Sequence, residues 1–237
     1  MTLSEFRALL LSDKVIDIIL DTDTYNEIDD QYALAYAMLS KKKINLLSVN
    51  AAPFFNSRSS SAAEGMEKSY NEIFNIMKLT DAEMAEQVPV YRGSTRFMTS
   101  KTDIVESDAC DNIINTVMSR ETPVVIVAIG AITNVASALL LEPKMKENTV
   151  IVWLGGTAHS YPDTLEFNMR QDIADARVVY KSGAPFVQQP CNGVVSEFRI
   201  SKPELEYWLI GKNPLADYLA KNTIEAAERY GLGYNLV

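Results

Sequence analysis

Short apolar runs alternate along the chain with amphipathic stretches of helical period. The runs are rich in β-branched residues and predict these strands: VIDIIL (15–20), INLLSV (44–49), VVIVAI (124–129), VIVWL (150–154) and PFVQQ (185–189). The stretches between them predict helices near residues 30–40, 58–79, 105–119, 133–142 and 172–182. Strands that are apolar throughout are typical of a parallel sheet with helices on both faces. The pattern therefore predicts a three-layer α/β fold with a mostly parallel sheet.

Residues at the ends of two predicted helices support this assignment. Thr133 is predicted to cap a helix that stops at Pro143. Gly183 follows the predicted helix that contains ADARVVYKS, at the position where a glycine commonly ends a helix. The sequence contains no internal repeat, low-complexity tract or obvious linker, so we expect residues 1–237 to form a single domain.

Composition and charge narrow the class of protein. An apolar fraction of 47% is that of a globular protein. The net charge of -9 argues against a nucleic acid or a membrane as partner, because an acidic surface repels both kinds of anionic surface. Cys110 and Cys191 lie far apart without zinc spacing, which favours a reducing compartment. We expect no signal peptide, since Glu5 comes early, and no run approaches membrane-spanning length; a cytoplasmic protein is expected.

The stretch VIDIILDTDTYNEIDDQYA places four aspartates where a predicted strand runs into a helix: Asp21, Asp23, Asp29 and Asp30. Like charges at this spacing repel each other, and a buried carboxylate is costly unless it is paired or bound to a cation. Asp29 and Asp30 alone can be explained by the positive end of the helix dipole. Together, the four predict a cation site. Carboxylate oxygens without His or Cys favour calcium or magnesium.

Other polar segments also follow predicted strands. Asn56 follows the second strand, GAITN follows the strand that ends at Ile129, and GGTAH follows Leu154. Ligands of open α/β sheets bind at the carboxyl ends of the strands. We therefore expect these segments to meet the aspartates at one edge of the sheet. His159 is the only histidine, and a histidine in a loop is by default an exposed polar residue.

The tripeptide EFN at 166–168 has two interpretations. If the segment is extended, Glu166 and Asn168 face one side and a buried Phe167 faces the other. A carboxylate and an amide presented together suit the hydroxyl groups of a sugar, because one accepts and the other donates hydrogen bonds. The alternative is a solvated loop with one buried aromatic side chain.

These motifs occur together in one known family. DTDTYNEIDD, AAPFFN, VAIGAITNVASALL, VWLGG and EFNMRQD appear in the order seen in the nucleoside hydrolases, the calcium-dependent inosine/uridine-preferring N-ribohydrolase family. The chain resembles that family from about Val15 to Val195, and most closely its bacterial-type branch with the longer DTDTYNEIDDQ loop. Better-known members have a shorter glycine-containing loop. The resemblance implies hydrolysis of the N-glycosidic bond of ribonucleosides to free base and ribose.

The resemblance also implies roles for individual residues. Asp23 matches the aspartate that coordinates Ca²⁺ and takes a proton from the bound water, and Asp30 matches the carboxylate that grips the ion through both oxygens. Ile129 matches a position whose main-chain carbonyl ligates the ion, and Asp21 looks like a supporting carboxylate. The residues that match contacts to the ribose hydroxyls are Asp29, Asn56, Glu166 and Asn168.

Two features depart from the family pattern. The family places a further metal-binding aspartate near the C-terminus, in many members beside a histidine that protonates the leaving base. Here the chain ends in YGLGYNLV without such an aspartate, so we expect the sequence to lack its C-terminal part. The longer acidic loop is expected to reshape the pocket. The expected partner is a small-molecule nucleoside, and a homo-oligomer is expected.

Two other functions stay open at this point. A strand followed by Asp-x-Asp also opens the magnesium-dependent haloacid-dehalogenase-like phosphatases. Tyr25 stands where that pattern usually has a small or β-branched residue, and Asp29 and Asp30 come too soon for its later acidic pair. The absent C-terminal ligand keeps open a catalytically inactive nucleoside- or ribose-binding protein. Release of free base from inosine or uridine separates the three.

Overall fold

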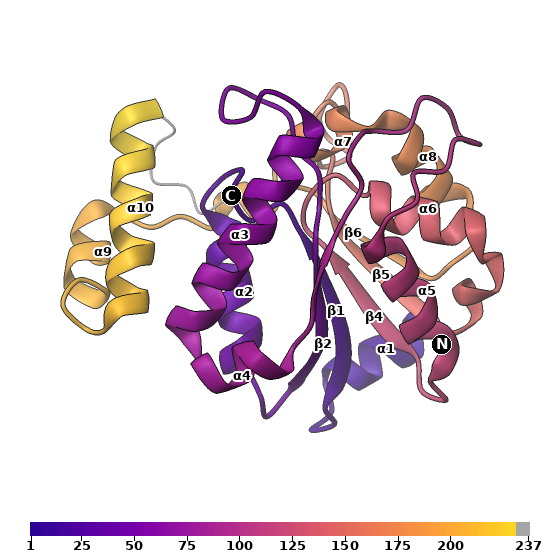
Figure 1. The fold of residues 1–237 in the computed structure, drawn as a ribbon, viewed down its shortest axis with the longest axis horizontal. Helices are drawn as coiled ribbons and strands as arrows, with labels where there is room; N and C mark the ends of the chain where they lie inside the picture. The colour runs from indigo at the N-terminus through magenta and orange to yellow at the C-terminus, as the bar shows by residue number, and fades with distance from the viewer. Residues whose placement is uncertain (231–237) are drawn as a thin grey trace.

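A six-stranded parallel sheet runs through the centre of the computed structural model, which describes residues 1–230 (Figure 1). Its strands are β1 (Ile16–Thr22), β2 (Ile44–Ala51), β3 (Val90–Arg92), β4 (Val124–Ala128), β5 (Thr149–Leu154) and β6 (Phe186–Gln189). Their order is β3-β2-β1-β4-β5-β6, and every neighbouring pair is parallel. The order reverses between β1 and β4, which is where open α/β sheets bind their ligands.

Helices cover both faces of the sheet (Figure 1). One face packs against α5 (Asp108–Ser119), α6 (Thr133–Leu141) and α8 (Ile173–Lys181). The other packs against α1 (Leu3–Leu10), α2 (Asp29–Leu39) and α3 (Ala62–Thr80). On that side α10 (Pro214–Tyr230) lies outside α3, next to α9 (Lys202–Trp208). The remaining short helices are α4 (Ala82–Gln87), η1 (Pro143–Glu147), α7 (Phe167–Gln171) and η2 (Val195–Glu197).

The β4 strand shows why these runs are apolar throughout. Val125 faces the core under α1, α2 and α3, whereas its neighbour Ile126 faces the core under α5, α6 and α8. Successive side chains of a strand point to opposite faces, so a sheet that is covered twice needs apolar residues at every position. Trp153 on β5 is fully buried in the second of these cores.

The predicted fold class and all five predicted strands are confirmed. The edge strand β3 was not predicted, because it has only three residues and all of them are partly exposed. The helices at both ends of the described chain, α1, α9 and α10, were not predicted either. Of these, α9 and α10 lie outside α3, away from the sheet (Figure 1).

The prediction for one helix end is confirmed and for the other is wrong. Gly183 follows α8 with φ +79°, a conformation that favours glycine because it has no Cβ. Thr133 does not cap α6: the N-cap residue is Ile132, which makes no side-chain cap bond. The hydroxyl of Thr133 instead donates to the carboxylates of Asp172 (3.0 Å) and Asp175 (3.1 Å), which lie at the start of α8.

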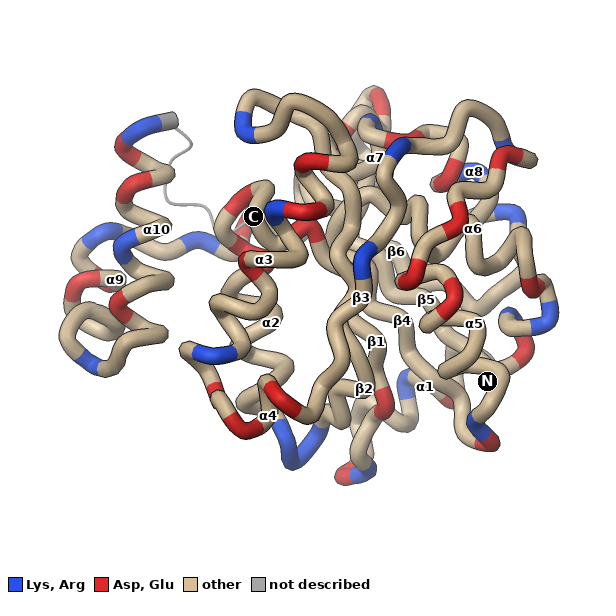
Figure 2. The backbone as a smooth tube through the Cα atoms, in the orientation of Figure 1, with Lys and Arg blue, Asp and Glu red and all other residues tan. Residues whose placement is uncertain are grey.

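Charged residues are interspersed over the described chain rather than gathered by sign. Figure 2 shows Lys and Arg next to Asp and Glu on most helices and loops of residues 1–230. Within the same residues, no helix combines the length and the apolar character that crossing a bilayer requires.

Candidate active site

The four aspartates converge at the carboxyl end of β1. Asp21 lies in the strand and is 0% exposed, and Asp23 follows the strand and is 1% exposed. Asp29 and Asp30 form the first turn of α2, where carboxylates meet the positive end of the helix dipole. The N-cap residue Ile28 offers no side-chain bond to this helix end. The predicted cluster is therefore present at the predicted edge.

Asp23 and Asp30 contact each other through their carboxyl groups. Burial raises the pKa of Asp30 to about 7, against a hydrogen bond from the Thr22 hydroxyl that lowers it. Burial also raises the pKa of Asp23 well above its usual range, and the charges of Asp30 and Asp29 add to the shift. Two buried carboxylates in contact strongly disfavour a second negative charge. A cation between them would remove that cost.

The oxygen atoms of this cluster are of the type that binds a hard cation such as Ca²⁺ or Mg²⁺. Oδ2 of Asp23 and Oδ1 of Asp29 are buried without a hydrogen-bond partner. The loop after β4 brings main-chain atoms alongside, because Gly130 lies so close that a Cβ there would be 2.9 Å from Cγ of Asp23. Within residues 1–230, no three side chains of Asp, Glu, His or Cys are grouped closely enough to hold a metal ion. The predicted set, two carboxylates and the Ile129 carbonyl, would need further oxygens from water or substrate.

Asp21 sits beneath this cluster. Its Oδ2 accepts a hydrogen bond from Nδ2 of Asn134 (2.9 Å), the last residue of the GAITN motif. Burial raises the pKa of Asp21 to about 7, although hydrogen bonds from Asn134 and Asn50 lower it. Asp21 therefore connects β1 to the start of α6.

The structure corrects the extended interpretation of EFN. Phe167 begins the helix α7 and is half-buried, while Glu166 is the N-cap residue. The Glu166 carboxylate accepts the main-chain N–H groups of Gly156 (2.7 Å), Asn168 (2.8 Å) and Met169 (3.1 Å). Glu166 and Asn168 are each 6% exposed. They do lie together, because the Glu166 carboxylate accepts the Asn168 N–H and both side chains contact the carboxyl end of β5, at Gly156 and Leu154.

Asn168 links two strand ends. Its Nδ2 donates to the main-chain carbonyls of Ile129 and Leu154, each at 3.0 Å. The loops after β4 and β5 are therefore tied together at the Ile129 carbonyl, which keeps a second lone pair free of this contact. Asn168 thus has a structural role that the sequence did not indicate.

Asn56 lies at the same edge, with both ends of its amide engaged. Its Nδ2 donates to Oδ1 of Asn26 (2.7 Å), and its Oδ1 accepts the main-chain N–H of Arg58 (2.8 Å). Asn56 is half-buried and ties the loop after β2 to the loop after β1. A ribose hydroxyl would have to share or replace one of these contacts.

Sequence reasoning missed two charged residues at this edge, Glu27 and Arg58. Burial raises the pKa of Glu27, the charge of Glu166 raises it further, and Arg58 lowers it. The charge of Glu27 also reaches Asp23, Asp29 and Asp30. The extra length of the DTDTYNEIDD loop was the available signal, since Glu27 belongs to that loop.

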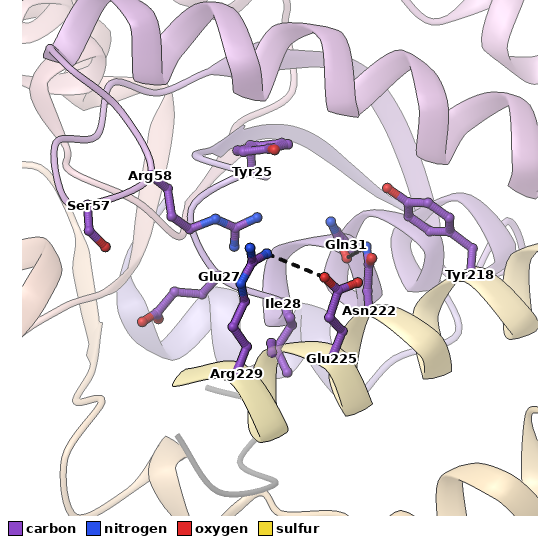
Figure 3. A pocket seen from close by; sticks show the side chains of 11 residues that line it. Tyr25, Glu27, Ile28, Gln31, Ser57, Arg58, Tyr218, Asn222, Glu225 and Arg229 are labelled. Carbon is purple, nitrogen blue, oxygen red and sulfur yellow. Dashed lines mark hydrogen bonds and ion pairs between the residues drawn. The ribbon is translucent and has the colours of Figure 1, made fainter. Parts of the chain in front are cut away.

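Two adjoining cavities open between this loop and α10 (Figure 3). Their volumes are about 300 Å³ and about 150 Å³. They share five lining residues: Glu27, Ile28, Ser57, Arg58 and Ala226. The smaller cavity also reaches Asn26 and Asn56, whereas none of Asp23, Asp29 and Asp30 lines either one.

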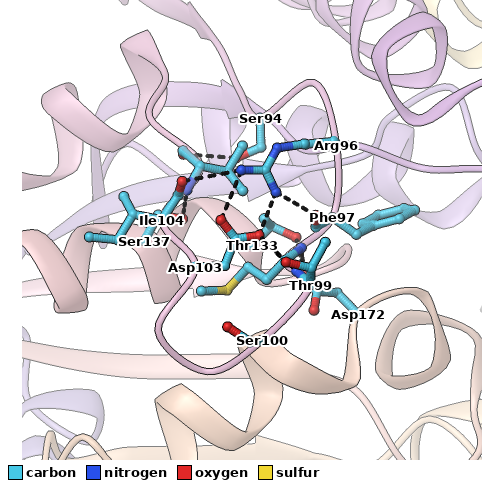
Figure 4. Close-up of polar contacts among 12 residues, drawn as sticks. Ser94, Arg96, Phe97, Thr99, Ser100, Asp103, Ile104, Thr133, Ser137 and Asp172 are labelled. Carbon is cyan, nitrogen blue, oxygen red and sulfur yellow. Dashed lines mark hydrogen bonds and ion pairs between the residues drawn. The ribbon is translucent and has the colours of Figure 1, made fainter.

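A second pair of buried carboxylates, Asp172 and Asp175, lies between α6 and α8. Oδ2 of Asp172 accepts the main-chain N–H of Met98 (2.6 Å) and the Thr133 hydroxyl (Figure 4). Asp175 is 0% exposed and its Oδ1 has no partner. Burial, and then the charge of Asp172, raise the pKa of Asp175 well above its usual range. Asp172 thus joins the loop after β3 to the starts of α6 and α8.

Replacing Asp175 by asparagine is expected to raise the melting temperature at pH 8 and to have a smaller effect at pH 4. The folded chain holds a proton that the unfolded chain releases from about pH 4 upward, so the free energy of unfolding falls as pH rises toward the raised pKa. Asparagine has no charge to bury, so the variant avoids this loss of stability. Its amide oxygen can still accept the hydrogen bond from the Thr133 hydroxyl. The gain at pH 8 should be on the order of 1–3 kcal/mol.

Thermal unfolding of Asp175→Asn and wild type at both pH values measures this effect. The exposed Asp111→Asn variant is the control and should show the same small change at each pH. A lower melting temperature for Asp175→Asn at pH 8 would contradict the proposed cost of the buried charge.

The fold and the site define a class: a doubly wound α/β protein with a carboxylate cluster at the switch point of its sheet. Solved structures share this fold. The purine-preferring ribonucleoside hydrolase from Gardnerella vaginalis superposes with a TM-score of 0.73 at 24% identity, covering 93% of this chain and 76% of that one. The inosine-uridine preferring nucleoside hydrolase from Bacillus anthracis gives 0.58 at 14% identity, covering 89% and 76%.

Sequence comparison specifies the family. The model of the inosine-uridine preferring nucleoside hydrolases matches residues 18–234, and the chain belongs to that family. The pyrimidine-specific ribonucleoside hydrolase RihB of Escherichia coli O139:H28 is 32% identical over 103 residues, which is 42% of this chain and 31% of that protein. The chain matches less than half the length of the curated relatives, 40% in the relative from Shigella boydii.

Proposed function

We propose that this protein hydrolyses the N-glycosidic bond of ribonucleosides to free base and ribose. The observation that carries the proposal is the meeting of Asp23, Asp29 and Asp30 with Glu166 and Asn168 at the carboxyl edge of the sheet, in a chain of the nucleoside hydrolase family. Membership of that family disfavours the phosphatase interpretation.

We further propose that the carboxylates of Asp23 and Asp30 and the carbonyl of Ile129 would hold Ca²⁺. The unpartnered Oδ2 of Asp23 and the contact between the two carboxyl groups support this assignment. When bound, the ion supplies Lewis acidity that makes water a better nucleophile near neutral pH. Its charge also holds the carboxyl groups ionised, against the burial that raises their pKa values.

The residues of this chain would carry the remaining steps. Asp23 accepts the proton of the attacking water as its oxygen approaches the anomeric carbon. Asp29 and Glu166 accept hydrogen bonds from the ribose hydroxyls and stabilise the positive charge that develops on the sugar ring. Asn168 holds the Ile129 carbonyl in place through its Nδ2 and offers its oxygen to the sugar. Asn56 contributes to the ribose site from the loop after β2, and Asp21 supports Asp23 from beneath.

The substrate class is best tested with a panel of nucleosides. The relative from Escherichia coli is named pyrimidine-specific, whereas the structural neighbour from Gardnerella vaginalis is named purine-preferring. The panel therefore contains uridine, cytidine, inosine and adenosine, with 2′-deoxyuridine as a control that lacks one hydroxyl. We expect release of free base from at least uridine or inosine, and a much slower reaction of the deoxynucleoside.

Removal of metal should abolish the reaction. The protein is treated with a chelator, dialysed, and assayed for release of base from uridine and inosine across a calcium series. Activity that returns with calcium supports both the function and the ion. Activity that survives chelation would contradict the calcium proposal, whereas binding of nucleosides without release of base would favour the inactive binding protein.

A cytoplasmic location and a homo-oligomeric state complete the proposal. The acidic composition and the two widely separated cysteines support the first. Light scattering coupled to size-exclusion chromatography measures the second, and a mass of 26.4 kDa, that of a single chain, would contradict it.

A further inference from the structure

A half-buried arginine, Arg58, is held at the mouth of the site (Figure 3). Its guanidinium carbon lies 4.6 Å from the centroid of the Tyr25 ring, and its Nη1 donates to the main-chain carbonyl of Asn26 (2.9 Å). Its main-chain N–H donates to Asn56. The guanidinium of Arg58 is thus fixed against the loop that carries the aspartates, and its backbone is joined to that loop through Asn56, which donates to Asn26.

The guanidinium of Arg58 keeps donors for a ligand. Two other arginines pair with carboxylates, Arg96 with Asp103 (2.5 Å) and Arg229 with Glu225 (3.4 Å). Arg58 has no carboxylate within 4.0 Å among residues 1–230. The contact with Asn26 engages one of the five N–H groups of a guanidinium. The others are available to an acceptor in the cavity.

Glu27 and Arg58 line both cavities, and Glu225 and Arg229 also line the larger one. The carboxylates of Asp29, Glu27 and Glu166 gather where the ribose is proposed to lie, and they favour a sugar that becomes positive. Arg58 faces the adjoining cavity, which extends toward α10. When an N-glycosidic bond breaks, the base becomes negative as the sugar becomes positive. A cation at this position favours that negative charge.

The walls of the larger cavity fit a flat heterocycle. Tyr25 and Tyr218 supply aromatic rings (Figure 3). Asn222 lines the same cavity and donates to Oε1 of Gln31 (3.2 Å), whose Nε2 donates to Glu72 (2.8 Å). Its volume of about 300 Å³ is at the lower end of the range for small-molecule sites.

We propose that Arg58 is a catalytic residue that stabilises the departing base, an inference that rests on the proposed nucleoside hydrolysis. The bond between C1′ and the base nitrogen breaks, and its electron pair moves onto the base. The water oxygen bonds to C1′, and its proton passes to Asp23. Arg58 keeps its own proton, since a guanidinium stays charged. It donates hydrogen bonds to the anionic base, which takes a proton from solvent after it leaves.

Stabilisation by a guanidinium depends on how poor the leaving group is, because a good leaving group carries its negative charge without help. That dependence gives the test.

The test compares two kinds of riboside in wild type, Arg58→Ala and Arg58→Lys. Uridine and inosine have poor leaving groups, whereas 4-nitrophenyl β-D-ribofuranoside releases a stable phenolate. We expect Arg58→Ala to lower kcat/KM for the nucleosides by about 10²–10³-fold, the usual effect of losing one such donor, and to leave the nitrophenyl riboside unchanged. Arg58→Lys keeps the positive charge but lacks the planar guanidinium, so its kcat/KM for the nucleosides should lie between those of wild type and Arg58→Ala.

Arg120→Ala is the matched control. Arg120 pairs with Asp17 (2.8 Å) at the opposite edge of the sheet, so its loss should affect neither substrate. Melting temperatures of all variants report whether the loss of the contact with Asn26 disturbs the fold.

The outcomes separate the two proposals. If wild type hydrolyses neither kind of riboside, the proposed function fails. Suppose instead that wild type is active. If Arg58→Ala then lowers kcat/KM by the same factor for both kinds of riboside, or leaves both unchanged, the leaving-group role is wrong and the function stands. Uridine 5′-monophosphate is assayed as a third substrate, and a loss confined to it would assign Arg58 to phosphate and overturn the inference.

Discussion

Replacing Asp23 by asparagine is expected to lower kcat for nucleoside hydrolysis by about 10²–10⁴-fold, the usual contribution of a positioned general base. The amide keeps the size of the side chain and one oxygen, but it cannot take a proton at neutral pH. Calcium binding should weaken as well, because one negative charge of the site is lost. The two effects add in an assay at low calcium.

A calcium series separates proton transfer from ion binding in Asp23→Asn. Saturating calcium should restore occupancy of the site without restoring turnover. Asp163→Asn is a control in the exposed loop after β5, and it should behave like wild type throughout the series. If Asp23→Asn recovers full activity at high calcium, Asp23 only holds the ion and the base lies elsewhere.

Replacing Asn168 by alanine is expected to damage both catalysis and folding. The two carbonyls that Nδ2 contacts, those of Ile129 and Leu154, lose their partner in a buried position. A buried polar group without a partner costs about 1–3 kcal/mol, so the melting temperature should fall. kcat/KM should fall further than this loss explains, because the Ile129 carbonyl and the ribose contact are both displaced.

Asn148→Ala provides a closely matched comparison. Nδ2 of Asn148 also donates to two main-chain carbonyls, those of Val117 (3.0 Å) and Arg120 (2.8 Å), at the opposite edge of the sheet. Its loss should lower the melting temperature while kcat/KM stays unchanged at a temperature where both variants are folded. Equal kcat/KM for Asn168→Ala and Asn148→Ala would return Asn168 to a purely structural role.

The sheet was predictable because its strands are apolar on both faces. A run such as VVIVAI is apolar at every position, which is typical of a central strand in a parallel sheet covered on both faces, and β4 is such a strand. The parallel arrangement then places every strand's carboxyl end at one edge. For this reason the convergence of Asp21, Asp23 and Asn134 could be expected from the sequence before any contact was known.

Other parts of the site depend on tertiary contacts that no local pattern encodes. The extended interpretation of EFN is wrong, because the Glu166 carboxylate caps α7 and the segment is the start of a helix. A three-residue motif is too short for its period to decide between the two. Glu27 and Arg58 acquire their importance only when the loops after β1 and β2 meet, through the bond from Asn56 to Asn26.

The position of α10 at the cavity also could not be predicted from local sequence patterns. Its Tyr218 hydroxyl donates to Glu72 on α3 (2.7 Å), and its Asn222 donates to Gln31 on α2 (3.2 Å). These contacts join residues separated by more than half of the chain, and they are polar. A pattern of apolar residues could therefore not predict that α10 closes one side of the cavity beside Arg58 (Figure 3).

Hydrolysis of uridine and inosine in ¹⁸O-labelled water tests the central claim most directly. With calcium present, the account predicts one free base and one ribose per nucleoside consumed, with a single ¹⁸O at C1 of the ribose and none in the base. Asp23→Asn should form this product at a rate lower by the factor given above. Wild type that forms no ribose with calcium, or that forms it no faster than Asp23→Asn, would contradict the assignment of this site.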